Sequence, residues 1–339
     1  MAAGRQATVG VLVLGGSGML GAMVADVLAR DGAVRVAATV RDRASLAAFQ
    51  ARAPEIEWAP FDASVPAGQR LGAMMADTVW VINCIGITKP YIHDGDPAET
   101  ERAIRMNSLF PYELSRAAGE RATVLQIMTD CVFDGAKGGY LEGTAHNVRD
   151  IYGKTKSLGE PLLGNVRSLW CSGIGPEARG FVFLLEWLRR QPLGSTVNGY
   201  VNHRWDGVTS LTSTSSGRST SRASSRPPTH AVLSFARVCL GIIKSGLPLP
   251  DVQHLVAGDS VSKAERLACI ARAYHRQDLS VRPVEADSAV DRTLQTEQVT
   301  LNEAMWAAAG YRWPPSIEEM VEELAQFDFR FEKVQPVQA

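Results

Sequence analysis

The chain lacks two features that would point to membranes or nucleic acid. No apolar stretch of its 339 residues approaches the roughly 18 needed to cross a bilayer, and the first residues lack the apolar core of a secretion signal. It also has no excess of charge of one sign, because 35 Lys and Arg oppose 36 Asp and Glu. We therefore expect a soluble, cytoplasmic protein that binds neither membrane nor nucleic acid.

Cysteine is scarce as well. The five cysteines are odd in number, widely spread and free of Cys-x-x-Cys pairs: Cys84, Cys131, Cys171, Cys239 and Cys269. This pattern argues against a zinc site, a redox dithiol and a disulfide framework. Reduced, mostly buried thiols are expected, and no metal site is predicted.

What the chain does have is a series of short apolar runs separated by helical segments. The runs predict buried strands at 9–14, 34–40, 56–62, 78–84, 124–128 and 165–170. Alternation of strand and helix predicts an α/β fold with a doubly wound parallel sheet and right-handed crossovers. Ligands of such sheets bind beyond the carboxyl ends of the strands, where Gly15, Cys84 and Thr129 are expected.

A glycine loop joins the first strand to a helix predicted over 22–30. Its spacing is Gly15-x-x-Gly18-x-x-Gly21, and the loop also contains Ser17, Met19 and Leu20. Glycines at this place let the backbone approach a pyrophosphate at the helix N-terminus, so all six residues are predicted to bind a dinucleotide. The alternative is a tight turn with a purely structural role.

Cofactor choice is predicted from the end of the second strand. Arg41 follows that strand directly, where a cation would meet the 2′-phosphate of NADP, so we expect NADPH, with NADH as the alternative. The competing interpretation is a solvated charge cluster in which Asp42 caps the next helix.

Three polar groups suggest proton delivery. Thr129 ends the strand 124–128, and the four-residue spacing places Tyr152 and Lys156 on one helix face. A hydroxyl, a phenol and an ammonium brought together can polarise and protonate a carbonyl. For the bare Tyr-x-x-x-Lys motif alone, the favoured interpretation is a surface helix that has an exposed Lys and a half-buried Tyr.

The longer string around these groups is more specific. It reads Thr-Asp-Cys-Val-Phe-Asp-Gly from Thr129 and Tyr-Gly-Lys-Thr-Lys-Ser-Leu-Gly-Glu from Tyr152. It resembles the dTDP-4-dehydrorhamnose reductase branch of the extended short-chain dehydrogenase/reductases. In that branch the strings read Ser-Thr-Asp-Tyr-Val-Phe-Asp-Gly and Tyr-Gly-x-x-Lys-x-x-Gly-Glu. Here Met128 replaces the Ser and Cys131 the Tyr, and neither change removes a proposed catalytic group.

The resemblance implies a function and a set of roles. It implies NADPH-dependent reduction of a 4-keto group on a nucleotide-activated deoxysugar, in deoxysugar and cell-surface polysaccharide biosynthesis. Thr129 and Tyr152 would polarise the carbonyl and Tyr152 would donate the proton. Lys156 would lower the pKa of Tyr152 and hold the nicotinamide ribose.

The resemblance also implies four further cofactor contacts. Asp62 would contact the adenine, although a plain turn Asp explains it nearly as well. Cys84 and Gly86 lie in an element similar to the family's Asn-x-Ala-Gly, which lines the nicotinamide. Asn107 matches a family Asn within a helix expected over 98–119. It is interpreted either as a site-facing amide at a kink before Pro111 or as plain packing.

The second half is less regular. Residues 1–171 are expected to form the NADP-binding domain, and 172–332 a smaller, mainly helical substrate lobe interleaved with returning sheet elements. Helices are expected at 181–190, 262–276, 300–309 and 316–327, and His203 is either a structural hydrogen-bonding residue or a substrate contact. Residues 212–228, rich in Ser, Thr and Arg, predict a disordered insertion, with a phosphate-binding arm as the alternative.

Two rival functions share this scaffold. An epimerase or dehydratase would keep and recycle its cofactor, but dehydratases of this kind generally have Asp-Glu after the strand-end Thr, where this chain has Asp130-Cys131. The other rival is a catalytically silent, NADP-binding regulatory subunit. The sequence is compatible with a homodimer.

Overall fold

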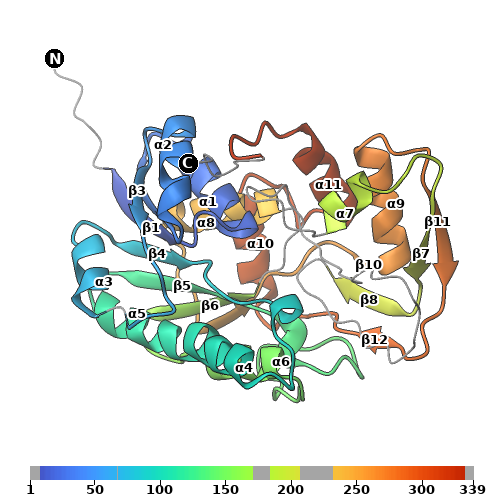
Figure 1. Ribbon diagram of the computed structural model, residues 1–339, viewed down its shortest axis with the longest axis horizontal. Helices are drawn as coiled ribbons and strands as arrows, with labels where there is room; N and C mark the ends of the chain where they lie inside the picture. The colour runs from blue at the N-terminus through green and yellow to red at the C-terminus, as the bar shows by residue number, and fades with distance from the viewer. Residues whose placement is uncertain (1–7, 67, 171–183, 207–231, 333–339) are drawn as a thin grey trace.

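A computed structural model describes residues 8–66, 68–170, 184–206 and 232–332. Its centre is a seven-stranded parallel sheet in the order β3-β2-β1-β4-β5-β6-β9 (Figure 1). The strands are β1 Val9–Leu14, β2 Val34–Val40, β3 Glu57–Pro60, β4 Trp80–Asn83, β5 Thr123–Met128, β6 Val166–Trp170 and β9 Val252–His254. The predicted doubly wound parallel sheet is therefore confirmed.

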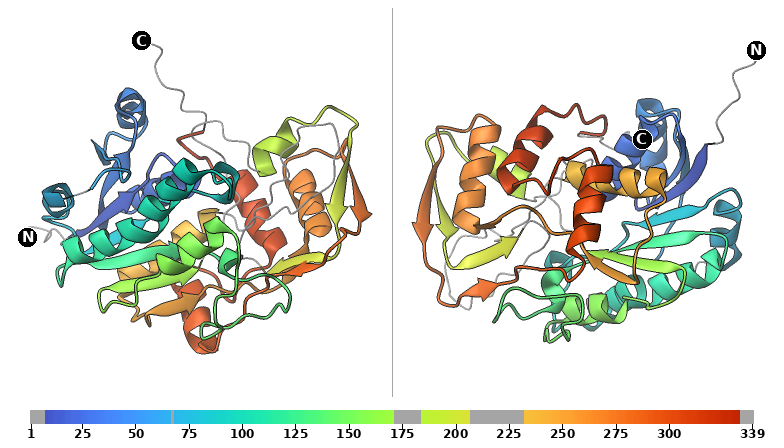
Figure 2. Two further views of the ribbon diagram at one scale, coloured as in Figure 1. Left: turned by 60° about the horizontal axis from the view of Figure 1, so that its bottom comes forward. Right: turned by 180° about the vertical axis from the view of Figure 1, so that it is seen from behind.

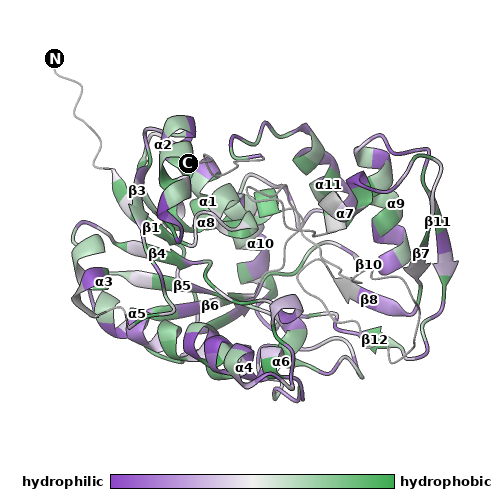
Figure 3. Ribbon diagram, viewed as in Figure 1, coloured by the Kyte–Doolittle hydropathy of each residue, from purple (hydrophilic) through white to green (hydrophobic). Residues whose placement is uncertain are grey.

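The apolar runs form strands because both faces of the sheet are buried. On β1, Val11 and Val13 pack with α1 (Met19–Ala29) and α8 (Val232–Ser245), while Leu12 and Leu14 pack toward α5 (Phe110–Ala118). A continuous apolar run suits a strand covered on both sides. Figure 3 shows that α5 has hydrophilic and hydrophobic residues interleaved, as expected of a helix with one buried face.

The remaining helices of the sheet half are short. They are α2 Arg43–Arg52, α3 Gly68–Met74, α4 Pro97–Ala103 and α6 Ile151–Leu158, with 3₁₀ turns at Lys89–Tyr91 and Asp130–Val132. The helix predicted over 22–30 begins earlier, at Met19, because Gly18 is its N-cap.

The helix predicted over 98–119 is interrupted. A π-helical segment, Ile104–Leu109, joins α4 to α5. Pro111 has no N–H to offer the carbonyl of Asn107 four residues earlier, and its ring would clash there in a regular α-helix. The kink expected near Asn107, before Pro111, is therefore confirmed.

Within the described residues, a second lobe comprises two small sheets and three helices. In it, β7 (Thr196–Tyr200) pairs with β11 (Ser280–Val284), and β8 (His203–Asp206) lies between β10 (Ser260–Ser262) and β12 (Val290–Asp291). Its helices are α7 Leu184–Arg189, α9 Lys263–Ala273 and α11 Ile317–Gln326; α10 Val299–Ala308 packs on α8. Figure 2 shows from two sides that α9, β7 and β11 lie at the opposite end of the molecule from α2.

The helices expected in the second half are confirmed within the described residues, but the sheet elements expected there were not assigned to particular residues. Strands β9 to β12 have two to five residues each and no long apolar run. Residues 212–228 and Cys171 lie outside the described residues. Among the described residues, no helix combines the length and apolarity needed to cross a membrane.

Candidate active site

The glycine loop lies between the end of β1 and the start of α1. Gly15 adopts φ +80° and donates its N–H to Thr39 Oγ1 at 3.0 Å. A Cβ on Gly21 would stand 2.3 Å from the Gly15 carbonyl oxygen, so only glycine lets α1 pack this closely on the loop.

The N-terminus of α1 suits an anion. It has no side-chain cap and no acidic residue in its first turn, and Ser17, Gly18, Met19 and Leu20 are at least partly exposed. Its first amides have no partner within the helix and face outward at the positive end of the helix dipole. This environment fits a pyrophosphate.

Arg41 and Asp42 have separate surroundings. The Asp42 side chain accepts a hydrogen bond from Ala44 N at 2.9 Å and caps α2, as the competing interpretation expected. Arg41 is exposed and follows β2 directly. This is the position from which a side chain could contact a 2′-phosphate. Asp62 accepts from Ser64 N at 2.9 Å, so it forms a local turn at the end of β3.

Asn107 fastens the loop that follows β4. Its Oδ1 accepts from Ile87 N at 2.8 Å, and its Nδ2 donates to Ile87 O at 2.9 Å and to Thr155 Oγ1 at 3.2 Å. The amide thus joins the loop containing Cys84 and Gly86 to α6. These hydrogen bonds agree with the packing interpretation of Asn107. A direct contact between Asn107 and the cofactor stays a prediction.

Thr129 and Tyr152 are brought together at the end of β5. The Thr129 hydroxyl accepts from Cys131 N at 3.3 Å and donates to Asp130 Oδ1 at 3.4 Å, and it lies close enough to the Tyr152 phenol to influence its pKa. A Cβ on Gly153 would lie 2.3 Å from the Cys131 carbonyl oxygen, so the glycine after Tyr152 allows α6 to approach the strand end. Asp150 caps α6 by accepting from Gly153 N at 2.8 Å.

Lys156 lies deep beside the same strand. Its Nζ donates to Ile127 O at 2.7 Å, and both Lys156 and Tyr152 are 7% exposed. The alternative of a surface helix with an exposed Lys is therefore wrong. The structure brings all three predicted catalytic residues to the carboxyl end of β5.

The pKa of Tyr152 differs from expectation. Burial raises the pKa of Tyr152, the charges of Cys131, Asp130 and Asp150 add to this, and the nearby Thr129 hydroxyl opposes it. We expected Lys156 to lower it, but the ammonium is directed to the Ile127 carbonyl. Burial lowers the pKa of Lys156 to about 8, while Glu160 and Cys84 act to raise it.

Sequence reasoning missed Arg292. This buried residue follows β12, and its Nε donates to Phe133 O at 2.9 Å in the loop after Thr129. Burial alone would lower the pKa of Arg292, but the neighbouring Cys131, Asp130 and Asp150 leave it raised. No motif signals this contact, because it joins segments about 160 residues apart.

His203 makes a structural contact. Its Nε2 lies 3.0 Å from Ser288 O, and its ring stands 4.9 Å from that of Tyr200. These contacts agree with the interpretation of His203 as a structural hydrogen-bonding residue.

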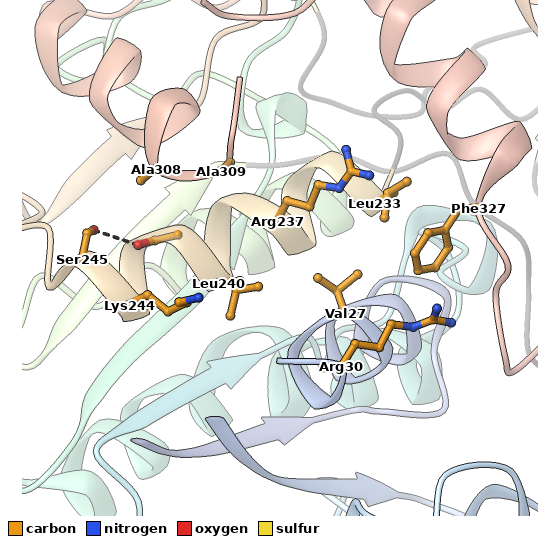
Figure 4. A pocket seen from close by; sticks show the side chains of 11 residues that line it. Val27, Arg30, Leu233, Arg237, Leu240, Lys244, Ser245, Ala308, Ala309 and Phe327 are labelled. Atoms are coloured by element: carbon orange, nitrogen blue, oxygen red, sulfur yellow. Dashed lines mark hydrogen bonds between the residues drawn. The ribbon is translucent and has the colours of Figure 1, made fainter. Parts of the chain in front are cut away.

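A separate cavity of about 540 Å³ lies between α1, α8 and α10 (Figure 4). Figure 4 shows Arg30, Arg237 and Lys244 around it, and each pairs with a carboxylate, of Asp26, Glu323 and Asp31 respectively. Val27 and Arg30 belong to the C-terminal end of α1, away from the glycine loop. None of the predicted site residues lines the cavity, so it is distinct from the candidate active site.

Comparisons with known proteins place this geometry in context. Residues 9–169 match the family model described as the RmlD substrate binding domain. A comparison with curated proteins gave no match.

Solved structures share the fold at low identity. A dTDP-4-dehydrorhamnose reductase from Bacillus anthracis, in complex with NADP, is 19% identical, with TM-score 0.63 over 94% of this chain and 98% of that one. The enzyme of the same name from Yersinia enterocolitica is 15% identical, with TM-score 0.66 over 94% and 99%. A UDP-glucuronic acid 4-epimerase from Bacillus cereus, in complex with NAD, is 13% identical, with TM-score 0.65 over 94% and 96%.

The structural neighbours thus include both reductases and an epimerase, so the shared fold does not by itself choose between these activities. The family match covers the glycine loop, the strand ends and all three predicted catalytic residues. Over residues 9–169, the resemblance to the dTDP-4-dehydrorhamnose reductase branch of the extended short-chain dehydrogenase/reductases is confirmed.

Proposed function

We propose that this protein uses NADPH to reduce a 4-keto group on a nucleotide-activated deoxysugar, as a step toward a cell-surface polysaccharide. The observation that carries the proposal is the burial of Thr129, Tyr152 and Lys156 together at the end of β5, where Lys156 Nζ donates to Ile127 O. The family match over this region and the reductases among the structural neighbours support it.

The chain's own residues supply the cofactor site. Gly15, Ser17, Gly18, Met19, Leu20 and Gly21 offer backbone donors to the pyrophosphate at the start of α1. Arg41 contacts the 2′-phosphate, and Asp62 the adenine. Cys84, Gly86 and Asn107 border the nicotinamide, and Lys156 holds the ribose. When bound, NADPH supplies the hydride.

Tyr152 supplies the proton. The Tyr152 and Thr129 hydroxyls hold the substrate oxygen and stabilise the charge that develops on it. Because burial raises the pKa of Tyr152, the phenol carries its proton throughout the neutral range. It remains a stronger acid than the alcohol that forms, so transfer to the developing alkoxide is favourable. Burial in turn lowers the pKa of Lys156 to about 8, so its amine is charged near neutral pH.

A panel experiment tests the function. Purified protein is mixed with NADPH and a set of nucleotide 4-keto sugars, and the loss of NADPH is followed. We expect oxidation with at least one sugar. Binding of NADPH without oxidation across the panel would favour a regulatory subunit. Interconversion of sugars without net oxidation would favour an epimerase.

A further inference from the structure

The chain beyond α11 returns from the second lobe to the sheet half. Residues 327–332, which we call the C-terminal strap, follow α11, and Figure 1 shows the chain running from α11 toward α1. Glu332 at the end of the strap accepts a hydrogen bond of 2.6 Å from Arg189 Nη1 of α7, which belongs to the second lobe. The strap therefore connects the two halves of the molecule.

Phe331 of the strap completes an aromatic cluster in the sheet half. Its ring is fully buried, with centroid distances of 5.3 Å to Phe49 on α2 and 5.4 Å to Trp58 on β3. The Phe49 and Trp58 rings are themselves 4.9 Å apart. Tilted and edge-to-face ring pairs at these separations attract each other. The Phe331 ring therefore supports the Trp58 indole.

The same indole lies against the glycine loop. A Cβ on Gly16 would stand 2.9 Å from Trp58 Cζ3, so the backbone of the loop is in direct contact with the ring. Trp58 Nε1 donates to Ala53 O at 3.1 Å, which sets the orientation of the indole. Gly16 lies between Gly15 and Ser17, two residues proposed above to bind the pyrophosphate. The position of Trp58 therefore limits how closely this loop can approach the sheet.

Arg330 fastens the strap to α1, the helix that begins at the glycine loop. The Asp26 carboxylate on α1 is fully buried and accepts from Arg330 Nε at 2.6 Å, from Arg330 N at 3.0 Å and from Arg30 Nε at 2.7 Å. An ionised carboxylate this deep is stable only when it is paired in this way. The strap thus reaches the glycine loop by two routes, through Trp58 beneath Gly16 and through α1.

We propose that Phe331 is a positioning residue for the dinucleotide: through Trp58 it fixes the place of the glycine loop, so that NADPH binding and docking of the strap support each other. The proposal rests on the function proposed above, in which this loop binds NADPH. Backbone donors serve a ligand well only when the surrounding packing holds them within about 0.5 Å of the productive geometry. Coupling of this kind is reciprocal, because each event stabilises the other by the same free energy.

Phe331→Ala tests the first direction of the coupling, because it removes the ring that supports Trp58. NADPH affinity, measured by titration, should fall about 2- to 30-fold, the range for a residue that acts on a site without touching its ligand. At saturating NADPH, kcat and the KM for the keto sugar should be nearly unchanged, because the groups around Tyr152 stay in place. Phe331→Leu keeps an apolar side chain and should recover most of the affinity.

The matched control is Leu324→Ala on α11. Leu324 is also buried, and α11 packs mainly on α9 and α8. Both alanine variants create a cavity, so both should lower the melting temperature. Only Phe331→Ala should weaken NADPH binding. An unchanged affinity in Phe331→Ala, or an equal loss in Leu324→Ala, would overturn the proposal.

Hydrogen exchange tests the opposite direction in the parent protein, and it decides the matter if Phe331→Ala does not fold. Saturating NADPH should slow the exchange of the strap amides, among them Arg330 N, which donates to Asp26. Unchanged exchange in the strap would overturn the proposal. If the parent binds NADPH but reduces no sugar, the reductase function fails, while the titrations and the exchange still decide the role of Phe331.

Discussion

The sheet half and the second lobe hold the candidate site by different means. In the sheet, strand register aligns the site: Leu14 pairs with Asn83, and Asn83 with Gln126, so the glycine loop, Cys84 and Thr129 emerge along one edge. From the second lobe, the segment after β12 reaches across to the loop that follows Thr129. There Tyr140 N donates to Thr293 O at 2.9 Å, and Gln295 N to Tyr140 O at 2.8 Å.

This difference assigns separate roles to the two regions: the sheet half holds the proposed catalytic and cofactor-binding groups, and the second lobe stabilises the loop beside them. The groups proposed for chemistry stand on buried parallel strands and on α6, which are rigid elements. The second lobe contributes contacts to the loop at 131–142 through Arg292, Thr293 and Gln295. Substitutions in the sheet half should therefore affect turnover or cofactor choice, and those in the second lobe should affect the stability of this loop.

The largest effect is expected from Tyr152→Phe. It removes one hydroxyl and keeps the packing of the ring, while the glycine loop and Lys156 stay intact. Turnover should fall about 10²–10⁴-fold, the range for a positioned general acid. NADPH affinity should be preserved, whereas Lys156→Ala should weaken it as well. Turnover and NADPH titration on the parent and both variants check this, and unchanged turnover in Tyr152→Phe would remove the mechanism.

Arg292→Ala tests the support from the second lobe. It leaves the buried Phe133 carbonyl without its donor, a loss of about 1–3 kcal/mol for an unsatisfied buried group. We expect a lower melting temperature and reduced turnover with little change in NADPH affinity.

The matched control for Arg292 is Arg282→Ala, an exposed residue of β11 that contacts Asn198. It should change neither melting temperature nor turnover. Equal effects from the two variants would show that Arg292 does not support the loop.

Arg41→Ala should alter cofactor choice. Loss of a charge-assisted contact of about 1.5–3 kcal/mol should weaken NADPH binding about 10- to 100-fold and leave NADH binding nearly unchanged. Arg43→Ala is the control, because Arg43 is also exposed but lies two residues further on. Titration with both cofactors measures the ratio, and equal losses would contradict the 2′-phosphate assignment.

The smallest effect is expected from deletion of residues 212–228. A solvated insertion costs little through loop length alone, so melting temperature and cofactor affinity should stay nearly constant. Calorimetry and NADPH titration check this prediction. A large loss of stability would show that the segment packs against the rest of the chain.

The sequence predicted the sheet half well for physical reasons. Strands buried on both faces read as continuous apolar runs, and the loop at Gly15 must contain glycine. The meeting of Thr129 with Tyr152 followed from their places at a strand end and a helix start.

The remaining features depend on tertiary contacts. The strands of the second lobe are too short to show a pattern, and β12 has two residues. Arg292 reaches a loop far away in the sequence, and the pKa of Tyr152 is governed by burial. Neither burial nor a contact over such a separation is visible in local sequence.

Transfer of deuterium tests the central claim most directly. NADPH carrying deuterium at the transferred position is incubated with the protein and a nucleotide 4-keto sugar that it accepts, and the product is examined by mass spectrometry and NMR. The account predicts NADP release in equal amount to product, with one deuterium on the carbon that bore the keto group. A sugar product without deuterium, formed with no net NADP release, would contradict it.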